Sequence, residues 1–399
     1  MRARLFFVLI FTILLSTVAP INTAAQPQIS GVEVDYVFGE QMVFQITVKS
    51  DGPLQGALIF YRNPGDNQSL FGEMEVINAR RGYYTLEFVH DLADQPLAPF
   101  TQLEYWAEVS FGNGEKISSP EQMILYFDNQ REWQSLEDDP LRVYWYSGDL
   151  AHALEVMDVA RGGLDSLQKV IPLTAPERVE IYVYPDIDTL ASVFNAGSSG
   201  AVAGHSQPNA GVIVVALPAT PEAGMLIEQR IPHELMHVLL YYTMGPAYDS
   251  LPVWLSEGLA SVVELYPNSD YEVLLNRANE DENLLPMDSL CRDFPQETSA
   301  ALLAYAQSTS FIRYLYQRFG SSGIQSLVDN YADGKSCQHG AEAAVGQNLT
   351  ELEQEWRRET FGEDTSKDAL NNLLPWLLLV GVLLAIPLLL TIVMVRKKR

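Results

Sequence analysis

The stretch His233-Glu234-Leu235-Met236-His237 is followed, twenty residues after its second histidine, by Glu257 within Pro252-Val-Trp-Leu-Ser-Glu257-Gly258. Two histidines four residues apart on a helix lie on one face, one turn apart, so both imidazoles can reach the same ion. Zinc in catalytic sites takes three protein ligands and leaves a fourth position for water. A carboxylate between the histidines that is not itself a ligand is placed to accept the proton of that water. The spacing therefore predicts a metal site with a general base.

The residues around this motif are those of a buried helix. Leu235, Met236 and the run from Val238 to Leu240 are apolar, and only six histidines occur in the chain, two of them at ligand spacing. The alternative is a core helix whose histidines form hydrogen bonds, because unpaired polar groups are costly in such surroundings. Pro232 directly precedes the motif, so we expect the helix to begin or to kink there. The spacing favours the metal site.

This motif, together with the downstream Trp254-Leu-Ser-Glu-Gly-Leu-Ala260, resembles the gluzincin metallopeptidases, the thermolysin-like branch of the zincins. It is most similar to the peptidase-MA-like domains of bacterial surface proteins. The resemblance extends from about Leu141 to Gly362. It implies an α+β zincin-like metallopeptidase domain with a helical carboxyl-terminal half.

The resemblance also implies a role for each motif residue. His233, His237 and Glu257 are expected as ligands of one Zn²⁺ per chain, and Glu234 as the general base on a water held by the zinc. The expected reaction is the hydrolysis of peptide bonds in a peptide or protein substrate.

Two features of this chain differ from patterns found in the family, and a third is expected from the resemblance. Many gluzincins carry an acidic residue four positions after the glutamate ligand, where this chain has Ser261, so the ligands must be oriented partly by another residue. The Gly-x-Met-Glu-Asn segment of the aminopeptidase branch is missing, which favours an endopeptidase over an aminopeptidase. An edge strand of the family pairs with the substrate backbone, and residues 201–205 or 211–215 are expected to form it.

An additional donor is needed to stabilise the oxyanion that develops during hydrolysis. Tyr305 is the first candidate, because its segment resembles the helix that follows the last ligand in the family. Tyrosine on a helix is also a common packing residue, which is the alternative. Tyr241, one turn beyond His237, is a rival, and His205 and His339 are weaker candidates.

Ahead of this domain, apolar residues alternate with a period of two from about Gln26 to Asn129. Asn113-Gly114 is a strong hairpin signal between the last two runs. Several short strands at this spacing predict an antiparallel β-sandwich of the immunoglobulin or fibronectin type, serving as a spacer or as a module that binds substrate or a partner. The expected strands lie at 32–38, 44–48, 57–61, 83–89, 103–111 and 123–127.

Both ends of the chain have membrane-related patterns. Met1-Arg-Ala-Arg4, an apolar stretch and Thr23-Ala24-Ala25 predict a signal peptide, while an uncleaved anchor is disfavoured because the stretch is short. The run from Leu373 to Val395 has no charge, is long enough to span a bilayer and precedes four basic residues. We therefore expect a single-pass protein of the cell membrane, held by this carboxyl-terminal helix, with an extracytoplasmic ectodomain and a cytoplasmic carboxyl terminus.

The charge of the chain indicates which partners it disfavours, and its two cysteines allow one disulfide. The chain has 25 Lys and Arg against 51 Asp and Glu, a formal net charge of −26, which disfavours nucleic acid as a partner. Cys291 and Cys337 are the two cysteines; a disulfide between them would stabilise the fold by about 4 kcal/mol in the chain-entropy model. An oxidising compartment favours this disulfide, and two free thiols are the alternative. The oligomeric state is left open.

The sequence thus predicts a multidomain chain: a β-sandwich, an α+β zincin-like domain and one transmembrane helix. The expected function is that of a membrane-anchored, extracytoplasmic zinc peptidase. One alternative is an inactive zincin-like surface protein that binds partners through its β-sandwich, and another is an envelope protein with a metal-stabilised fold. The expected segments are a signal peptide at 1–25, the β-sandwich at 26–130, the peptidase domain at 131–363, a tether at 364–372, a transmembrane helix at 373–395 and a cytoplasmic tail at 396–399.

Overall fold

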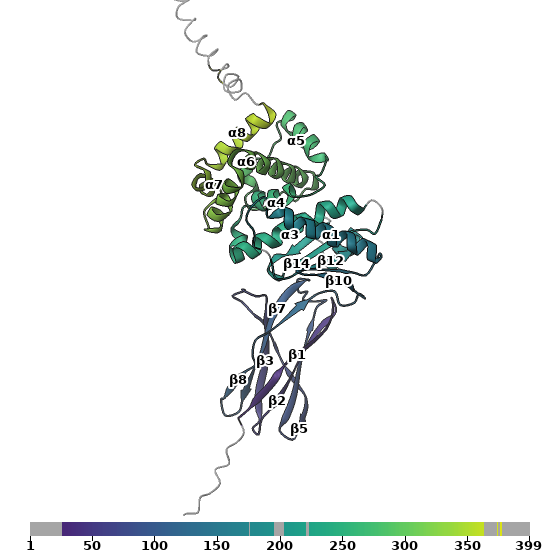
Figure 1. Cartoon of the computed structure of the whole chain (residues 1–399). Coiled ribbons are helices and arrows are strands. Elements are labelled where there is room, and N and C mark those ends of the chain that lie inside the picture. The colour runs from purple at the N-terminus through teal and green to yellow at the C-terminus, as the bar shows by residue number, and fades with distance from the viewer. Residues whose placement is uncertain are drawn as a thin grey trace, which may run out of the picture. The chain divides into compact units, whose positions relative to one another are not determined.

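The computed structural model describes residues 26–174, 176–194, 203–220, 223–362, 373 and 376 (Figure 1). The chain forms two compact units. The first consists of the residues up to Leu97 and of Gln102–Leu125, and the second of Ala98–Thr101 and the chain from Tyr126 onward.

The first unit is built from two antiparallel sheets. One has the strand order β1-β2-β6-β5, and the other β4-β3-β7-β8, with β9 also paired to β7. The bounds are β1 Gln28–Val37, β2 Gln41–Lys49, β3 Leu54–Arg62, β4 Leu70–Glu73, β5 Glu75–Arg80, β6 Tyr83–Asp91, β7 Thr101–Phe111, β8 Lys116–Ser118 and β9 Gln122–Tyr126.

The period-two pattern explains these strands, since alternate side chains of a strand point to opposite faces. In β2 the buried residues are Met42, Phe44, Ile46 and Val48. The turn at Asn113–Gly114 forms, with Gly114 at φ +85°, but it leads into the short β8 instead of directly into β9. The hairpin signal was thus correct about the turn and missed the strand that follows it.

The second unit is organised around a mixed sheet with the strand order β10-β11-β12-β14-β13. The three central strands are parallel, and the two outer pairs are antiparallel. Every residue of β12 and β14 is buried, as expected for central parallel strands. The bounds are β10 Gln134–Asp138, β11 Leu141–Trp145, β12 Val179–Tyr184, β13 Gly204–Gln207 and β14 Val212–Ala216.

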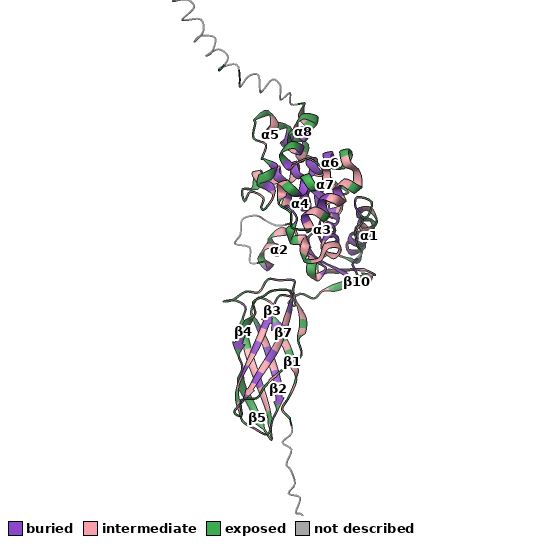
Figure 2. Cartoon of the chain, turned by 90° about the vertical axis from the view of Figure 1, so that its left-hand side faces the viewer, coloured by how far each residue is buried: buried purple, intermediate pink, exposed green. Residues whose placement is uncertain are grey.

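Helices complete this unit. α1 and α3 contact the sheet and each other, and the helices that follow pack beyond them around a shared apolar core (Figures 1 and 2). The longest of these helices, α6, is interrupted at Gly320, whose φ is +67°. The bounds are α1 Leu150–Leu167, α2 Ile187–Val193, α3 Ala223–Met244, α4 Val253–Val262, α5 Asp270–Glu280, α6 Thr298–Ala332, α7 Cys337–Val345 and α8 Leu349–Phe361, with 3₁₀ turns η1 Pro208–Ala210, η2 Gly245–Ser250 and η3 Met287–Leu290.

Pro232 lies inside α3, so the motif helix does not begin there. A proline has no N–H to donate to the carbonyl four residues earlier, here that of Glu228. The backbone N–H of Leu265 donates to this carbonyl instead, at 2.9 Å. Because of the proline, the carbonyl of Glu228 is left to bind the segment that follows α4.

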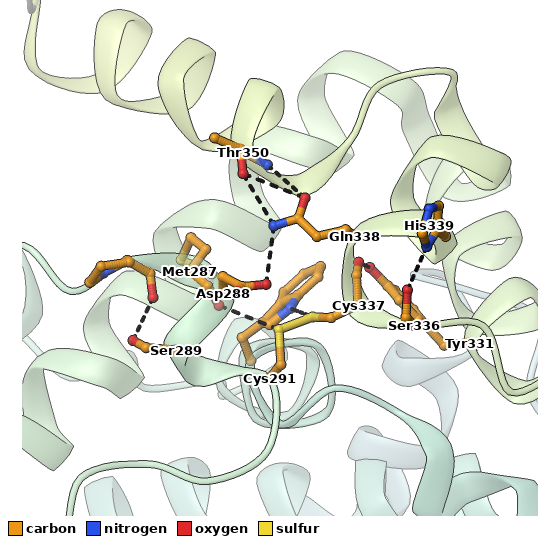
Figure 3. The surroundings of a disulfide bond; sticks show 12 residues. Met287, Asp288, Ser289, Cys291, Tyr331, Ser336, Cys337, Gln338, His339 and Thr350 are labelled. Carbon is orange, nitrogen blue, oxygen red and sulfur yellow. Dashed lines mark hydrogen bonds between the residues drawn. A yellow bond between two sulfur atoms is a disulfide. The ribbon is translucent and has the colours of Figure 1, made fainter.

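Cys291 and Cys337 form a disulfide, which confirms the expected pairing (Figure 3). Both cysteines also contact the first turn of α4. The N–H of Val253 donates to the carbonyl of Cys291 at 3.1 Å, and the indole N–H of Trp254 donates to Sγ of Cys337 at 3.4 Å. The N-cap residue, Pro252, makes no side-chain cap. Cys291 therefore accepts the hydrogen bond of one backbone N–H that has no partner within the helix, and Cys337 contacts a side chain of the same turn.

The fold class expected from the sequence needs a correction, because it included a transmembrane helix. Within the described part of the chain, no helix is long and apolar enough to cross a membrane. The long described helices α3 and α6 carry charged residues, such as Arg230 and Arg318, and pack on the core. Apart from Leu373 and Trp376, the run at 373–395 lies outside the described residues, as do the segments at 1–25, 364–372 and 396–399.

Candidate metal centre

His233, His237 and Glu257 come together as one group that could hold a metal ion. A ligand atom from each lies within 4.8 Å of the other two. Nε2 of His233 is 3.4 Å from Oε2 of Glu257, and Nε2 of His237 is 3.7 Å from the same oxygen. The two histidines lie on adjacent turns of α3, while Glu257 comes from α4. Two imidazole nitrogens and one carboxylate are a donor set that catalytic zinc uses.

The other ring nitrogen of each histidine is held by a protein group. Nδ1 of His233 lies 3.1 Å from Oε1 of Glu264, and Nδ1 of His237 lies 2.9 Å from the hydroxyl of Tyr248, on η2. An ionised carboxylate can only accept, so Glu264 favours the tautomer of His233 that carries hydrogen on Nδ1. That tautomer leaves Nε2 free to bind a metal.

The electrostatics of the group follow from this closeness. Burial alone would lower the pKa of His233, but its hydrogen bonds to Glu257 and Glu264, with the charge of Glu234, raise it to about 10. Burial alone would raise the pKa of Glu257, but the two histidines hold it well below its usual range. His233 in its protonated form and Glu257 in its ionised form thus stabilise each other, and a cation bound to both would displace the proton of His233.

Glu234 is buried on α3 and does not belong to the ligand group. Its carboxylate faces the start of β13: a Cβ added to Gly204 would come within 2.6 Å of Oε1 of Glu234. Only a glycine at this position of the strand leaves the carboxylate where it is. Glu234 therefore lies between the ligands and the edge of the sheet.

Of the two segments considered from the sequence, 201–205 overlaps β13, which lies at an edge of the sheet. β14, which contains most of 211–215, is paired on both sides and is interior. Pairing of β14 with β13 leaves the outer backbone edge of β13 without a strand partner among the described residues. An extended peptide could add to such an edge.

The four candidates for an oxyanion donor lie in different surroundings. Tyr305, on α6, has its ring centroid 6.3 Å from that of His233, and burial, followed by the charges of Glu257 and Glu234, raises its pKa. His205, on β13, is near enough to Glu234 and His237 for their charges to act on it, and burial lowers its pKa.

The two remaining candidates are less directly placed. Tyr241 packs against Tyr248, with ring centroids 6.1 Å apart, and so stands behind the residue that contacts His237. His339 lies on α7, where Nδ1 is 2.8 Å from the hydroxyl of Ser336 (Figure 3). Tyr305 and His205 are thus the candidates that the fold brings to the metal group.

Sequence reasoning missed Glu264 and Tyr248. The family pattern directed attention to position 261, four residues after Glu257, whereas the carboxylate that contacts His233 is seven residues after it. The signal that could have been used is an acidic residue at the end of an apolar run, since Glu264 directly follows Ser261-Val-Val263. Glu264 is buried in the structure, and a buried acid is rarely without a partner.

The comparison with protein families agrees with this geometry. The model of the Peptidase MA superfamily matches residues 159–362. No curated protein is similar to the chain in sequence. Among solved structures, OgpA from Akkermansia muciniphila is 10% identical, with a TM-score of 0.21 over 26% of this chain and 28% of that one. The match therefore spans less than a third of the length of OgpA. An aminopeptidase N family protein from Idiomarina loihiensis is 8% identical, with a TM-score of 0.34 over 85% of this chain and 73% of that one.

The superfamily match carries the assignment. It covers just over half of the 399 residues, and it contains the two histidines, both glutamates of the site and Glu264. The chain belongs to the Peptidase MA superfamily.

Proposed function

We propose that this chain is a zinc-dependent peptidase that hydrolyses peptide bonds with Glu234 as its general base. The observation that carries the proposal is the convergence of two Nε2 atoms and the Glu257 carboxylate, with Nδ1 of each histidine held by its own partner. Partners of this kind on the outer nitrogens fix the orientation of metal-binding imidazoles and leave Nε2 of each histidine for the ion.

The donor set fits zinc better than the harder cations. Calcium and magnesium prefer oxygen ligands, whereas two imidazoles and one carboxylate suit zinc. His233, His237 and Glu257 would hold the ion. When bound, zinc would supply a Lewis acid that polarises the scissile carbonyl and makes a water acidic.

The protein side chains would handle the proton and the substrate. Glu234 would accept the proton of the attacking water and pass it to the leaving amine. Its carboxylate faces Gly204 at the start of β13, where a substrate backbone would pass. The raised pKa of Tyr305 keeps its phenol protonated at neutral pH, so it could donate to the developing oxyanion.

The edge strand and one feature of the sequence support endopeptidase action. Substrate backbone paired with β13 would pass Glu234 at Gly204. The chain lacks a Gly-x-Met-Glu-Asn segment for a free amino terminus, which supports endopeptidase action. The disulfide supports an oxidising, extracytoplasmic compartment.

The test measures metal content and peptide-library cleavage of the wild-type chain beside Glu234→Gln. We expect about one zinc per chain in both proteins, and cleavage that a chelator stops in the wild type alone. Glu234→Gln should lower kcat by at least about a thousandfold, because it removes the base and leaves the ligands in place. Zinc binding without turnover of any peptide would favour the alternative, an inactive zincin-like module that binds partners.

A further inference from the structure

Arg230 lies on α3, one turn before the motif. Residues at i, i+3, i+4 and i+7 share a helix face, so Arg230 belongs to the same stripe as His233, Glu234 and His237. The side chain is half-buried. A cation therefore stands beside the proposed general base, at the end of the site opposite to His237.

The contacts of this guanidinium place it at the beginning of the edge strand. Its Nη1 donates to the carbonyl of Ala216, the last residue of β14. The N–H of Ala216 donates to the carbonyl of Ala203 at 3.0 Å, and Ala203 immediately precedes β13. Arg230 is thus next to the strand that would pair with a substrate.

Most of the hydrogen-bonding capacity of this guanidinium is unused. An arginine has five N–H donors, and one contact to Ala216 is formed. Among the described residues, no carboxylate oxygen lies within 4.0 Å of it. Burial lowers the pKa of Arg230 while the charge of Glu234 opposes that effect, and an arginine remains charged in either case.

The other half-buried arginines of the second unit are paired. Arg142 forms an ion pair with Glu137 at 3.2 Å, and Arg357 forms one with Glu353 at 2.6 Å. The chain has about twice as many acidic as basic residues, so carboxylates are abundant, and yet none of the described ones meets Arg230. A partly buried charge without a direct ion-pair partner is costly, which points to a partner that arrives with the ligand.

We propose that Arg230 binds a carboxylate of the peptide substrate and so directs cleavage to sites near an acidic side chain or a free carboxyl terminus. This inference rests on the proposed peptidase function. The planar guanidinium can hold a carboxylate through two parallel hydrogen bonds, which gives direction as well as charge. The acidic surface of the chain would repel such substrates at long range, so the preference would arise from this contact and not from steering.

The experiment compares matched peptides with the purified full chain. Glutamate replaces glutamine at each position around a cleaved bond, and a second set has free or amidated carboxyl termini. We expect one position, or the free terminus, to raise kcat/KM about tenfold or more over its neutral partner. The two sets distinguish an acidic side chain from a terminal carboxylate.

Variants assign the preference to the residue. Arg230→Gln and Arg230→Met should lower the acidic-to-neutral ratio of kcat/KM to near one, and Arg230→Lys should retain part of it. Arg277→Gln is the matched control: it removes the same charge from an exposed position on α5 and should keep the wild-type ratio. Zinc content and Tm show whether each variant has folded.

Two results would overturn the inference. One is a wild type that cleaves peptides through Glu234 but shows no preference for a carboxylate at any position, which needs no variant. The other is an equal loss on acidic and neutral peptides in the folded Arg230 variants, which would make Arg230 a structural residue. Absence of all cleavage would instead reject the proposed function itself, and this inference with it.

Discussion

The two helices that supply the proposed metal ligands are supported in different ways. α3 has 22 residues, contacts α1 and the sheet, and presents both histidines from adjacent turns. α4 has ten residues and no side-chain cap, and it presents Glu257 only because other segments hold it. Its first turn contacts Cys291 and Cys337, and its middle lies against α6 at Gly258. The histidine pair thus follows from local helix geometry, whereas the third ligand depends on tertiary contacts.

This difference predicts that removing the disulfide acts on α4 more than on α3. Cys291→Ser with Cys337→Ser should lower the free energy of unfolding by about 4 kcal/mol, because a cross-link over 46 residues is lost. The affinity for zinc should fall as well, since the start of α4 loses support. Thermal unfolding and zinc titration measure both effects. A lower Tm with unchanged zinc affinity would mean that α4 is held independently of the cysteines.

A smaller perturbation tests the middle of α4 by itself. A Cβ at position 258 would lie 2.6 Å from Cγ1 of Ile312 and 2.8 Å from the carbonyl oxygen of Ser308. Gly258→Ala should therefore cost about 1–3 kcal/mol of stability and weaken zinc binding by shifting Glu257.

The control for this variant is Gly162→Ala on α1, where nothing lies within 4 Å of the added carbon. It should maintain or raise Tm, because alanine favours a helix. Equal Tm values for the two variants in thermal unfolding would show that α4 and α6 are not tightly packed at Gly258.

The smallest expected effect concerns the outer partners of the two histidines. Glu264→Gln should lower zinc affinity about 10–100-fold, because His233 loses a charged acceptor on Nδ1. Tyr248→Phe removes a neutral hydroxyl from His237 and should cost less. Competition with a calibrated chelator measures both affinities.

Ser261→Ala is the matched control, since neither outer nitrogen contacts position 261. A greater loss of affinity in Ser261→Ala than in Glu264→Gln would contradict the assignment of Glu264 as the residue that orients His233.

The sequence could predict those parts of the site that depend on short-range geometry. The spacing of His233 and His237 is a property of any helix, and the motif around Glu257 resembles a family in which that glutamate is a ligand. The same argument located most strands of the first unit, because alternation is local.

The remaining parts depend on how distant segments meet. Glu264 reaches His233 across 31 positions, and Tyr248 reaches His237 from a 3₁₀ turn. The choice of β13 as the edge strand is set by the pairing order of the sheet. The transmembrane helix was expected from the apolarity and length of a segment. These two properties show that a segment is compatible with lipid, but they do not show how the folded chain arranges it.

Pro232 has a consequence for anyone who wishes to make this protein more robust. A routine stabilising design would replace an internal helix proline with alanine to restore the missing N–H. Here the restored N–H would compete with Leu265 for the carbonyl of Glu228, and Leu265 is the neighbour of Glu264. The repaired helix would be more regular, and the segment that orients His233 would lose its anchor. Regularity of the helix and order of the metal site are here opposing design goals.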